Sequence, residues 1–200
     1  MQTSKKIKLA QWISEICIPP FFLIFVVTIF LINSTGIITD KVLWWFILFI
    51  VPACLPIAYI IYLFRKGKVS NKHLPIKSER TRPYIVAILC ILLAILLLKS
   101  TNAPAILIVL MTAYLVNAVF LLLINFTWKV SAHAVGVACP LMVLSWSFGQ
   151  IISPFFLIVP LIAWARWQLG AHTFAEVLMG SLAGLGLTYL QLHYGTILFG

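Results

Sequence analysis

Residues 104–126 read PAILIVLMTAYLVNAVFLLLINF, a stretch that contains no charged residue. An α-helix of about 20 apolar residues is long enough to cross the hydrocarbon core of a lipid bilayer. Because lipid offers no hydrogen-bond partners, the backbone of a lipid-exposed segment must pair its own N–H and C=O groups, as a helix does. The stretch therefore predicts a transmembrane α-helix.

Six more apolar runs share this character and lie on both sides of the first. They span residues 10–33, 41–64, 84–98, 134–148, 151–165 and 173–193. Several of these runs are short, so the pattern is consistent with either six or seven membrane spans. The sequence therefore predicts an all-α fold, a polytopic transmembrane helix bundle.

The composition of the 200-residue chain excludes a soluble domain. Hydrophobic residues make up 63% of the chain and charged residues only 9%, whereas soluble domains carry about 25% charged residues. The length favours a single integral membrane domain over residues 1–200. Within it we expect two N-terminal spans at 1–64, a basic loop at 65–83 and a catalytic helical core at 84–200.

Basic residues are distributed unevenly along the chain. Fourteen Lys and Arg oppose four acids, and most of them lie near the N-terminus or in three polar segments at 65–83, 127–133 and 166–172. On the seven-span interpretation, two spans separate each polar segment from the next. All three segments then lie on one membrane face together with the N-terminus. The excess of basic residues in short cytoplasmic loops places this face in the cytoplasm.

The basic balance also bears on the partners of the protein. There is no soluble basic domain that could present a groove, so we expect no nucleic-acid partner. Anionic lipid headgroups are the expected partners of the basic residues near the span ends. The sequence carries no information on the oligomeric state.

The three polar segments contain the residue types that a phosphate site needs. An Arg guanidinium donates two parallel hydrogen bonds to a phosphate group, and three of the four Arg lie at Arg80, Arg82 and Arg166. His172 and Glu176 are four residues apart, and they share one face of the last helix if that helix begins near Gly170. A carboxylate that accepts from one imidazole nitrogen leaves the other free to act as nucleophile or base.

Three short motifs follow one another in these segments. They are Lys77…Arg82-Pro83, Ser131-Ala132-His133 and Arg166-x5-His172-x3-Glu176. Over residues 77–176 the series resembles the type 2 phosphatidic acid phosphatase superfamily, in its bacterial branch. The pattern of that family is Lys-x6-Arg-Pro, then Pro-Ser-Gly-His, then Ser-Arg-x5-His-x3-Asp. This chain departs from it in the shorter first spacing and at Val130, Ala132, Ala165 and Glu176.

The resemblance implies which residues would bind the phosphate. They are the side chains of Lys77, Arg82, Arg166 and Ser131, together with the backbone around Ala132. Lys72 or Arg80 is an alternative to Lys77 or Arg82, because the spacing between those two differs from that of the family. The family generally uses no metal ion, and we expect no cofactor.

The resemblance also implies the reaction. His172 would attack phosphorus to form a phosphohistidine, and Glu176 would orient His172. His133 would protonate the leaving alkoxide and later activate water. The substrate would be a lipid phosphate monoester or diphosphate of the phosphatidic acid, phosphatidylglycerol phosphate or prenyl phosphate class, and the protein would lie in a bacterial inner membrane.

Other functions are consistent with the same residues. A transporter for an anion or a lipid would explain the basic residues and the acid at Glu176. A metallohydrolase would use His133, His172 and Glu176 as ligands. A membrane homologue without catalytic activity would retain the fold alone, and Glu176 would then only satisfy a helix terminus or a neighbouring polar group.

Two features outside the motifs have simple structural interpretations. His73 lies in a basic loop, where a solvated side chain is ordinary. Gly180 and Gly184 lie one turn apart in the last expected span, and small residues at this spacing let two helices approach closely. We expect this contact to lie inside the bundle and not between two copies of the chain.

Overall fold

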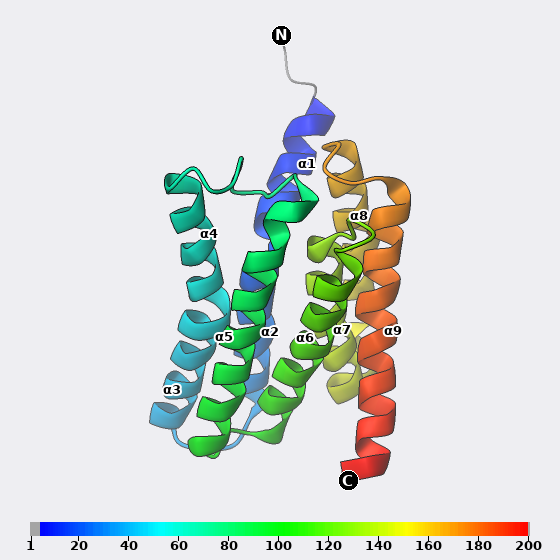
Figure 1. Ribbon diagram of the computed structural model, residues 1–200. Helices are drawn as coiled ribbons and strands as arrows, with labels where there is room; N and C mark the ends of the chain where they lie inside the picture. The colour runs from blue at the N-terminus through cyan, green and yellow to red at the C-terminus, as the bar shows by residue number, and fades with distance from the viewer. Residues whose placement is uncertain (1–4, 200) are drawn as a thin grey trace.

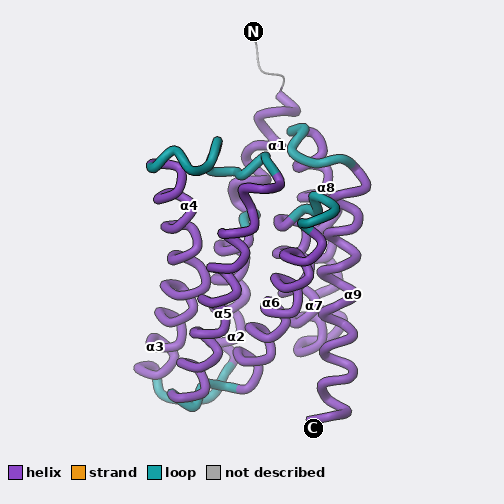
Figure 2. The backbone as a smooth tube through the Cα atoms, viewed as in Figure 1, coloured by secondary structure: helices purple, strands orange, loops and turns teal. Residues whose placement is uncertain are grey.

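The fold is entirely helical over the residues that the structure describes. This computed structural model describes residues 5–199, with the side chains of residues 5–194, and contains no strand in that range (Figure 1). The helices run side by side, and the loops that join them gather at the two ends of the bundle (Figure 2). The predicted all-α class is therefore confirmed.

Several helical stretches are long and apolar enough to cross a membrane. Four satisfy both conditions, at Ile38–Arg65, Lys77–Ser100, Ala105–Ile124 and Ala132–Gln168, and a bent helix pair near the N-terminus gives a fifth. The described residues therefore hold four or five such stretches, in agreement with an integral membrane protein. The last of the four has 37 residues, far more than the roughly 20 that one crossing requires.

The first expected span, 10–33, consists of two helices. Helix α1 covers Lys5–Ile16 and α2 covers Pro19–Asn33, and the two are bent by 54°. Ile18 has an extended backbone between them, because the residue before a proline is disfavoured in the helical conformation. The two prolines that follow lack the N–H groups to continue α1 but fit the first turn of α2.

The second expected span, 41–64, is interrupted in its middle. Helix α3 covers Ile38–Leu48, the π-helical segment η1 covers Phe49–Cys54, and α4 covers Leu55–Arg65. Pro52 lies inside η1, where it cannot donate the backbone hydrogen bond of a regular α-helix. π-Helical turns are frequent at functional positions, and Pro52 lines the cavity described below.

The basic loop is shorter than expected, because the next helix begins early. A 3₁₀ turn, η2, covers Lys77–Arg80 and continues directly into α5 at Thr81–Ser100. The last part of the expected loop 65–83 is therefore helical. Helix α6 covers Ala105–Ile124 and packs along α5.

The 37-residue helical stretch folds back on itself. Helix α7 covers Ala132–Phe148, the 3₁₀ segment η3 covers Gly149–Leu157, and α8 covers Ile158–Gln168. Gly149 has a φ of +69°, a left-handed conformation that glycine adopts without steric cost. The start of α7 and the end of α8 line the same cavity, so both ends of the stretch lie at one end of the bundle.

The last helix, α9 at Phe174–Phe199, packs closely against α7. A Cβ atom at Gly180 would lie 2.7 Å from the carbonyl oxygen of Ser131, and one at Gly184 would lie 2.7 Å from the Cβ atom of Ala138. Both glycines therefore face α7, and the helices come this close because side chains are missing there. The expected glycine contact inside the bundle is confirmed.

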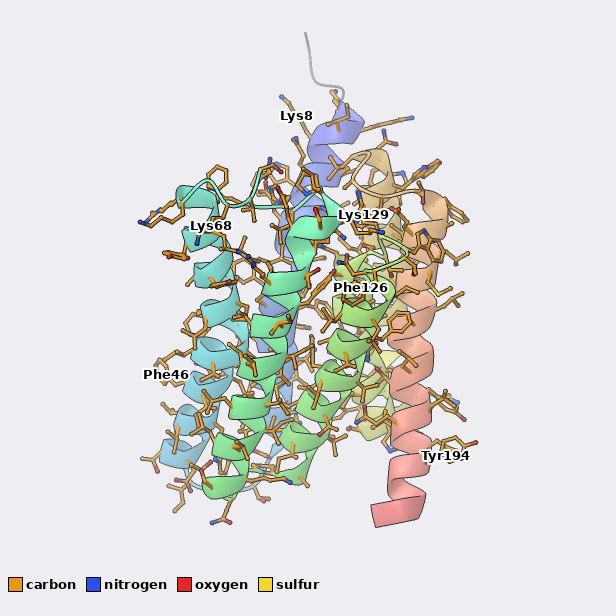
Figure 3. The ribbon with its side chains drawn as sticks, viewed as in Figure 1. Lys8, Phe46, Lys68, Phe126, Lys129 and Tyr194 are labelled. Carbon is orange, nitrogen blue, oxygen red and sulfur yellow. The ribbon has the colours of Figure 1, made fainter. Side chains whose placement is uncertain are left out.

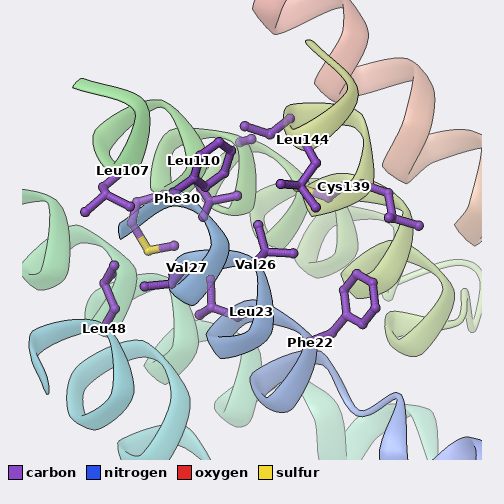
Figure 4. Packing of buried hydrophobic residues seen from close by; sticks show 14 of the residues in the cluster. Phe22, Leu23, Val26, Val27, Phe30, Leu48, Leu107, Leu110, Cys139 and Leu144 are labelled. Atoms are coloured by element: carbon purple, nitrogen blue, oxygen red, sulfur yellow. The ribbon is translucent and has the colours of Figure 1, made fainter. Parts of the chain in front are cut away.

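An apolar core surrounds α2 in the middle of the bundle. Val26 and Val27 of α2 are fully buried in one cluster with Leu48 of α3, Leu110 of α6 and Leu144 of α7 (Figure 4). In lipid, close packing of this kind holds helices together, because burial from water contributes little between membrane helices. The core therefore holds these helices in place relative to one another.

Polar side chains gather at one end of the bundle. Lys8, Lys68 and Lys129 lie at that end, whereas Phe46 lies further along the bundle (Figure 3). The loops that contain Lys68 and Lys129 belong to the first two polar segments of the sequence. The third polar segment joins α8 to α9 at the same end (Figure 1), so the fold brings all three segments together.

Candidate active site

A cavity of about 440 Å³ lies at the polar end of the bundle. Its volume falls within the range of about 300–1,000 Å³ that is usual for small-molecule sites. Its basic lining residues come from three loops and the adjoining helix ends, and they are Lys72, His73, Arg80, His133, Arg166 and His172. No acidic side chain of the described residues lines this cavity, so it suits an anion.

The rest of the cavity is largely apolar and extends into the bundle. Side chains of α2, α4, α5 and α6 line it, among them Leu23, Ile61, Ile91 and Met111. Ile91 lies about 16 Å further along the helix than Arg80, at 1.5 Å per residue. The cavity therefore combines a cationic end with a deep apolar end, a shape that matches an amphiphilic anion.

His172 is held by its Nδ1 atom. Nδ1 lies 3.0 Å from Oε2 of Glu176 and 3.2 Å from the carbonyl oxygen of Lys129. Because both neighbours are acceptors, Nδ1 carries the proton and donates it. Nε2 is then the basic nitrogen of an imidazole that lines the cavity. The structure thus brings His172 and Glu176 together as predicted, but α9 begins only at Phe174, so His172 lies just before the helix and not on its face.

Glu176 also closes the N-terminus of α9. Its Oε2 accepts from the N–H of Thr173 at 3.1 Å, and the hydroxyl of Thr173 accepts from the N–H of Glu176 at 3.3 Å. This reciprocal pair is a capping box, which satisfies two free N–H groups of the first helical turn. Glu176 therefore satisfies a helix terminus and orients the imidazole with the same carboxylate.

The surroundings of His172 keep its imidazole neutral. Burial is the largest cause that lowers the pKa of His172, and the positive charges of Arg80 and Arg166 lower it further, while the hydrogen bond to Glu176 raises it. The resulting pKa is about 4, below the ordinary value of 6.5. At neutral pH Nε2 therefore has a free lone pair, which a nucleophile requires.

Arg166 reaches the cavity from the end of α8. Its side chain is buried, and Nη1 donates to the hydroxyl of Ser14 at 2.8 Å. Its Nε is also buried and has no hydrogen-bond partner among the described residues. Because buried N–H groups are nearly always satisfied, an unpaired guanidinium N–H at a cavity residue indicates a missing acceptor. A phosphate oxygen would supply one.

Arg80 lines the cavity and Arg82 does not. Arg80 is only 6% exposed, and it donates from Nε to the carbonyl oxygen of Leu74 at 2.8 Å and from Nη1 to that of Val130 at 3.4 Å. Arg82 is exposed and lies outside the lining. Residues two apart on a helix point in nearly opposite directions. The start of the helix at Lys77 therefore favours Arg80, the alternative from the sequence, over Arg82.

Lys77 and Ser131 make structural contacts beside the cavity. Nζ of Lys77 donates to two carbonyl oxygens of the loop after α6, at 2.9 and 3.2 Å, which ties η2 to that loop. Ser131 is fully buried, and its hydroxyl caps the first turn of α7. Neither residue lines the cavity, whereas Ala132 and His133 at the start of α7 do.

Two residues at the site, Ser14 and His73, lie outside the expected set, and a third, Lys72, is the other alternative to Lys77 or Arg82. Ser14 of α1 holds Arg166, and Lys72 and His73 line the cavity from the loop before η2. The side chain of His73 is exposed, as expected, yet it belongs to the cavity wall. Two sequence features could have identified these residues. Ser14 is a polar residue inside an apolar run, and His73 is the only imidazole in its basic loop.

Within residues 5–199 no group of three or more His, Cys, Asp or Glu side chains is arranged to hold a metal ion. The positive charge at the cavity comes instead from side chains of the protein, above all from Arg80 and Arg166. The chain matches no family model, no curated protein and no solved structure.

Proposed function

We propose that this protein is a membrane-embedded phosphatase that hydrolyses a lipid phosphate through a phosphohistidine intermediate, without a metal ion. The observation that carries the proposal is the environment of His172. Its Nδ1 donates to Glu176 and its pKa is lowered, which makes Nε2 a neutral nucleophile. Two cations and a second imidazole, Arg80, Arg166 and His133, line the same cavity. Phosphoryl transfer uses this set of groups.

The first chemical step transfers the phosphoryl group to His172. The lone pair of Nε2 forms a bond to phosphorus while the bond from phosphorus to the lipid oxygen breaks, and that oxygen keeps the bonding electrons. His133, which takes up a proton when the anionic phosphate binds, donates that proton to the leaving oxygen as general acid. Arg80 and Arg166 stabilise the negative charge on the phosphoryl oxygens.

The second step hydrolyses the phosphohistidine. His133, now neutral, accepts a proton from a water molecule as the water oxygen attacks phosphorus. The bond from phosphorus to Nε2 breaks, its electrons return to His172, and inorganic phosphate leaves. Because Glu176 holds Nδ1 during both steps, the imidazole keeps one tautomer and one orientation.

The shape of the cavity supports a lipid substrate. The apolar part of the cavity, which extends to Ile91, about 16 Å along the helix from Arg80, would contribute nothing to the binding of a water-soluble phosphate. A hydrocarbon tail in this apolar chamber would place its phosphate among the cations at the polar end. Phosphatidic acid, phosphatidylglycerol phosphate, and prenyl phosphates or diphosphates all have this form.

We extend the proposal to the topology. Seven spans would follow from α1–α2, α3–α4, α5, α6, α7, η3–α8 and α9, with the polar end in the cytoplasm. The support is the charge distribution, since Lys41 and Lys99 are the two basic residues that fall at the far end on this path. Labelling of a single cysteine at position 70 in intact cells and in inverted vesicles tests the sidedness.

Release of inorganic phosphate by the purified protein in lipid nanodiscs tests the function. We expect turnover of at least one lipid phosphate, and a loss of at least about 1,000-fold in His172→Ala, because a nucleophile acts as a unit with its partners. The control is His193→Ala, near the other end of α9. Full turnover by His172→Ala would refute the mechanism, and anion flux into vesicles without phosphate release would identify a transporter.

A further inference from the structure

The loop between α4 and η2 brings additional positive groups to the cavity. Lys72 and His73 line it, yet the reaction proposed above assigns them no role. Arg80 and Arg166 already provide the cations for the phosphoryl group that is transferred. Two further donors in a cavity whose described lining has no acid indicate additional negative charge on the ligand.

This loop is anchored on both sides of the two residues. The carboxylate of Glu79 accepts from the N–H and the hydroxyl of Ser70, at 2.8 and 3.0 Å. Leu74 is buried with a φ of +49°, a left-handed backbone that is rare for a bulky residue and is retained only where the surroundings impose it. The loop therefore presents Lys72 and His73 to the cavity from fixed positions.

His73 lies on the side of His133. His73 and His133 both line the cavity, and His73 is among the groups close enough to act on His133 but not among those that act on His172. In the proposed reaction His172 attacks phosphorus from one side, and His133 protonates the leaving oxygen on the other. On this arrangement we place His73 beside the leaving group.

We infer that the substrate carries a second phosphate on its leaving group, and that Lys72 and His73 bind this phosphate. The inference rests on the proposed function. It selects lipid diphosphates, and lipid phosphates joined to the tail through a phosphodiester, over simple lipid monophosphates. An imidazole has an N–H to donate in either protonation state, and Lys adds a full charge.

The two substrate forms differ in how the leaving oxygen is stabilised. With a diphosphate, Nε2 of His172 attacks the terminal phosphorus, and the bridging oxygen keeps the bonding electrons and departs on a lipid monophosphate. Lys72 and His73 then stabilise the charge that this phosphate gains. With a phosphodiester-linked substrate, the leaving oxygen is an alkoxide that takes its proton from His133, and the diester stays bound to the loop.

Two matched substrate pairs test the inference. One is a prenyl monophosphate and a prenyl diphosphate with the same tail, and the other is phosphatidic acid and phosphatidylglycerol phosphate with the same acyl chains. We expect the wild-type protein to favour the doubly phosphorylated member of at least one pair in kcat/KM. His73→Ala and Lys72→Ala should each lower that preference about tenfold, the effect of one charge-assisted hydrogen bond.

Lys68→Ala is the matched control, because Lys68 is exposed in the same loop and lies outside the cavity lining. It should keep the wild-type preference. If His73→Ala and Lys72→Ala lose the preference within the prenyl pair, the second phosphate is part of a diphosphate. If they lose it within the phosphatidic acid pair, the second phosphate is a phosphodiester. Turnover with an unchanged preference in both His73→Ala and Lys72→Ala would overturn the inference and leave the phosphatase function intact.

Measurements of ligand binding test the second phosphate site without requiring turnover. The probes are a methylene-bridged lipid bisphosphonate and a lipid monophosphonate with the same tail, neither of which can be hydrolysed. We expect tighter binding of the bisphosphonate, measured by tryptophan fluorescence in nanodiscs, and a loss of about tenfold in His73→Ala. Equal affinity for the two probes would overturn the inference even if no lipid phosphate were hydrolysed.

Discussion

The two sides of the candidate active site are built in opposite ways. On the α7–α9 side, Gly180 and Gly184 bring two helices into direct contact, and the ends of these helices carry His133, His172 and Glu176. On the α2–α4 side, prolines interrupt the helices, and the cavity lies between residues 18–23 and residues 56–61. One side is rigid and polar at its end, and the other is irregular and apolar.

This difference shows which part of the site must hold its side chains at fixed separations. Bond formation at phosphorus requires the nucleophile and the acid to keep their separation, and a glycine contact between helices gives little room for adjustment. A hydrocarbon tail has no directional contacts to satisfy, so its chamber can be formed by helix breaks and large aliphatic side chains. Variants on the two sides should therefore fail in different ways, and to different extents.

Among variants that alter the packing of the two sides, the largest effect is expected from one added methyl group on the close-packed side. Gly180→Ala places a Cβ atom 2.7 Å from the carbonyl oxygen of Ser131, so α7 and α9 must move apart. We expect the free energy of unfolding to fall by about 1–3 kcal/mol. We expect kcat to fall about 100-fold, because a displacement of about 1 Å at reacting groups has a cost of this size.

Gly186→Ala is the control for this variant. Position 186 lies on the same helix, and a Cβ atom there would meet no atom within 4 Å. It should keep the wild-type kcat and gain stability by up to about 1 kcal/mol from helix propensity. Denaturation in detergent and phosphate release measure both quantities. Equal behaviour of the two alanine variants would show that the glycine contact does not fix the site.

The next largest effect is expected from Arg80→Gln, which tests whether the charge of Arg80 lowers the pKa of His172. Arg80 lowers the pKa of His172, so Arg80→Gln should raise that pKa towards its ordinary value. The neutral imidazole is then lost at a higher pH, and the acidic limb of kcat/KM, which reports the free enzyme, should move to higher pH. We also expect kcat/KM at neutral pH to fall about tenfold, as a charge-assisted contact to phosphate is lost.

Arg82→Gln is the matched variant for Arg80→Gln. Arg82 is exposed and lies outside the cavity lining, so its removal should leave the acidic limb of the pH profile in place. The pair also decides between the two arginines that the sequence left open. A shift of the limb in Arg82→Gln alone would return the phosphate-binding role to Arg82.

The sequence was sufficient for what depends on local spacing. Apolar runs of sufficient length predict the helices, and the four-residue spacing predicts the contact between His172 and Glu176. The bends at Pro19 and Pro52 follow from the missing proline N–H, but their size depends on how the helices pack. The apolar runs therefore identified the class of the fold, and packing determined where its helices break.

The remaining site residues depend on long-range packing. Arg80 and Arg82 are identical residues two positions apart in one segment. The residue at which the helix begins decides which of the two side chains lines the cavity. Ser14 accepts a hydrogen bond from Arg166, which lies 152 positions away in the chain. No sequence pattern within either segment predicts that contact. His73 joins the cavity because Glu79 and Leu74 hold its loop in place.

The smallest effect is expected from the irregular side. Ile61 of α4 lines the apolar chamber and is partly buried, so Ile61→Ala enlarges the chamber without touching the phosphate. We expect kcat to change less than about threefold and the preference to move towards bulkier tails, because each of the three carbon atoms removed contributes about 1 kcal/mol of apolar contact. Leu55→Ala, on an exposed face of the same helix, is the control. A loss of kcat as large as that of Gly180→Ala would mean that both sides position the reacting groups.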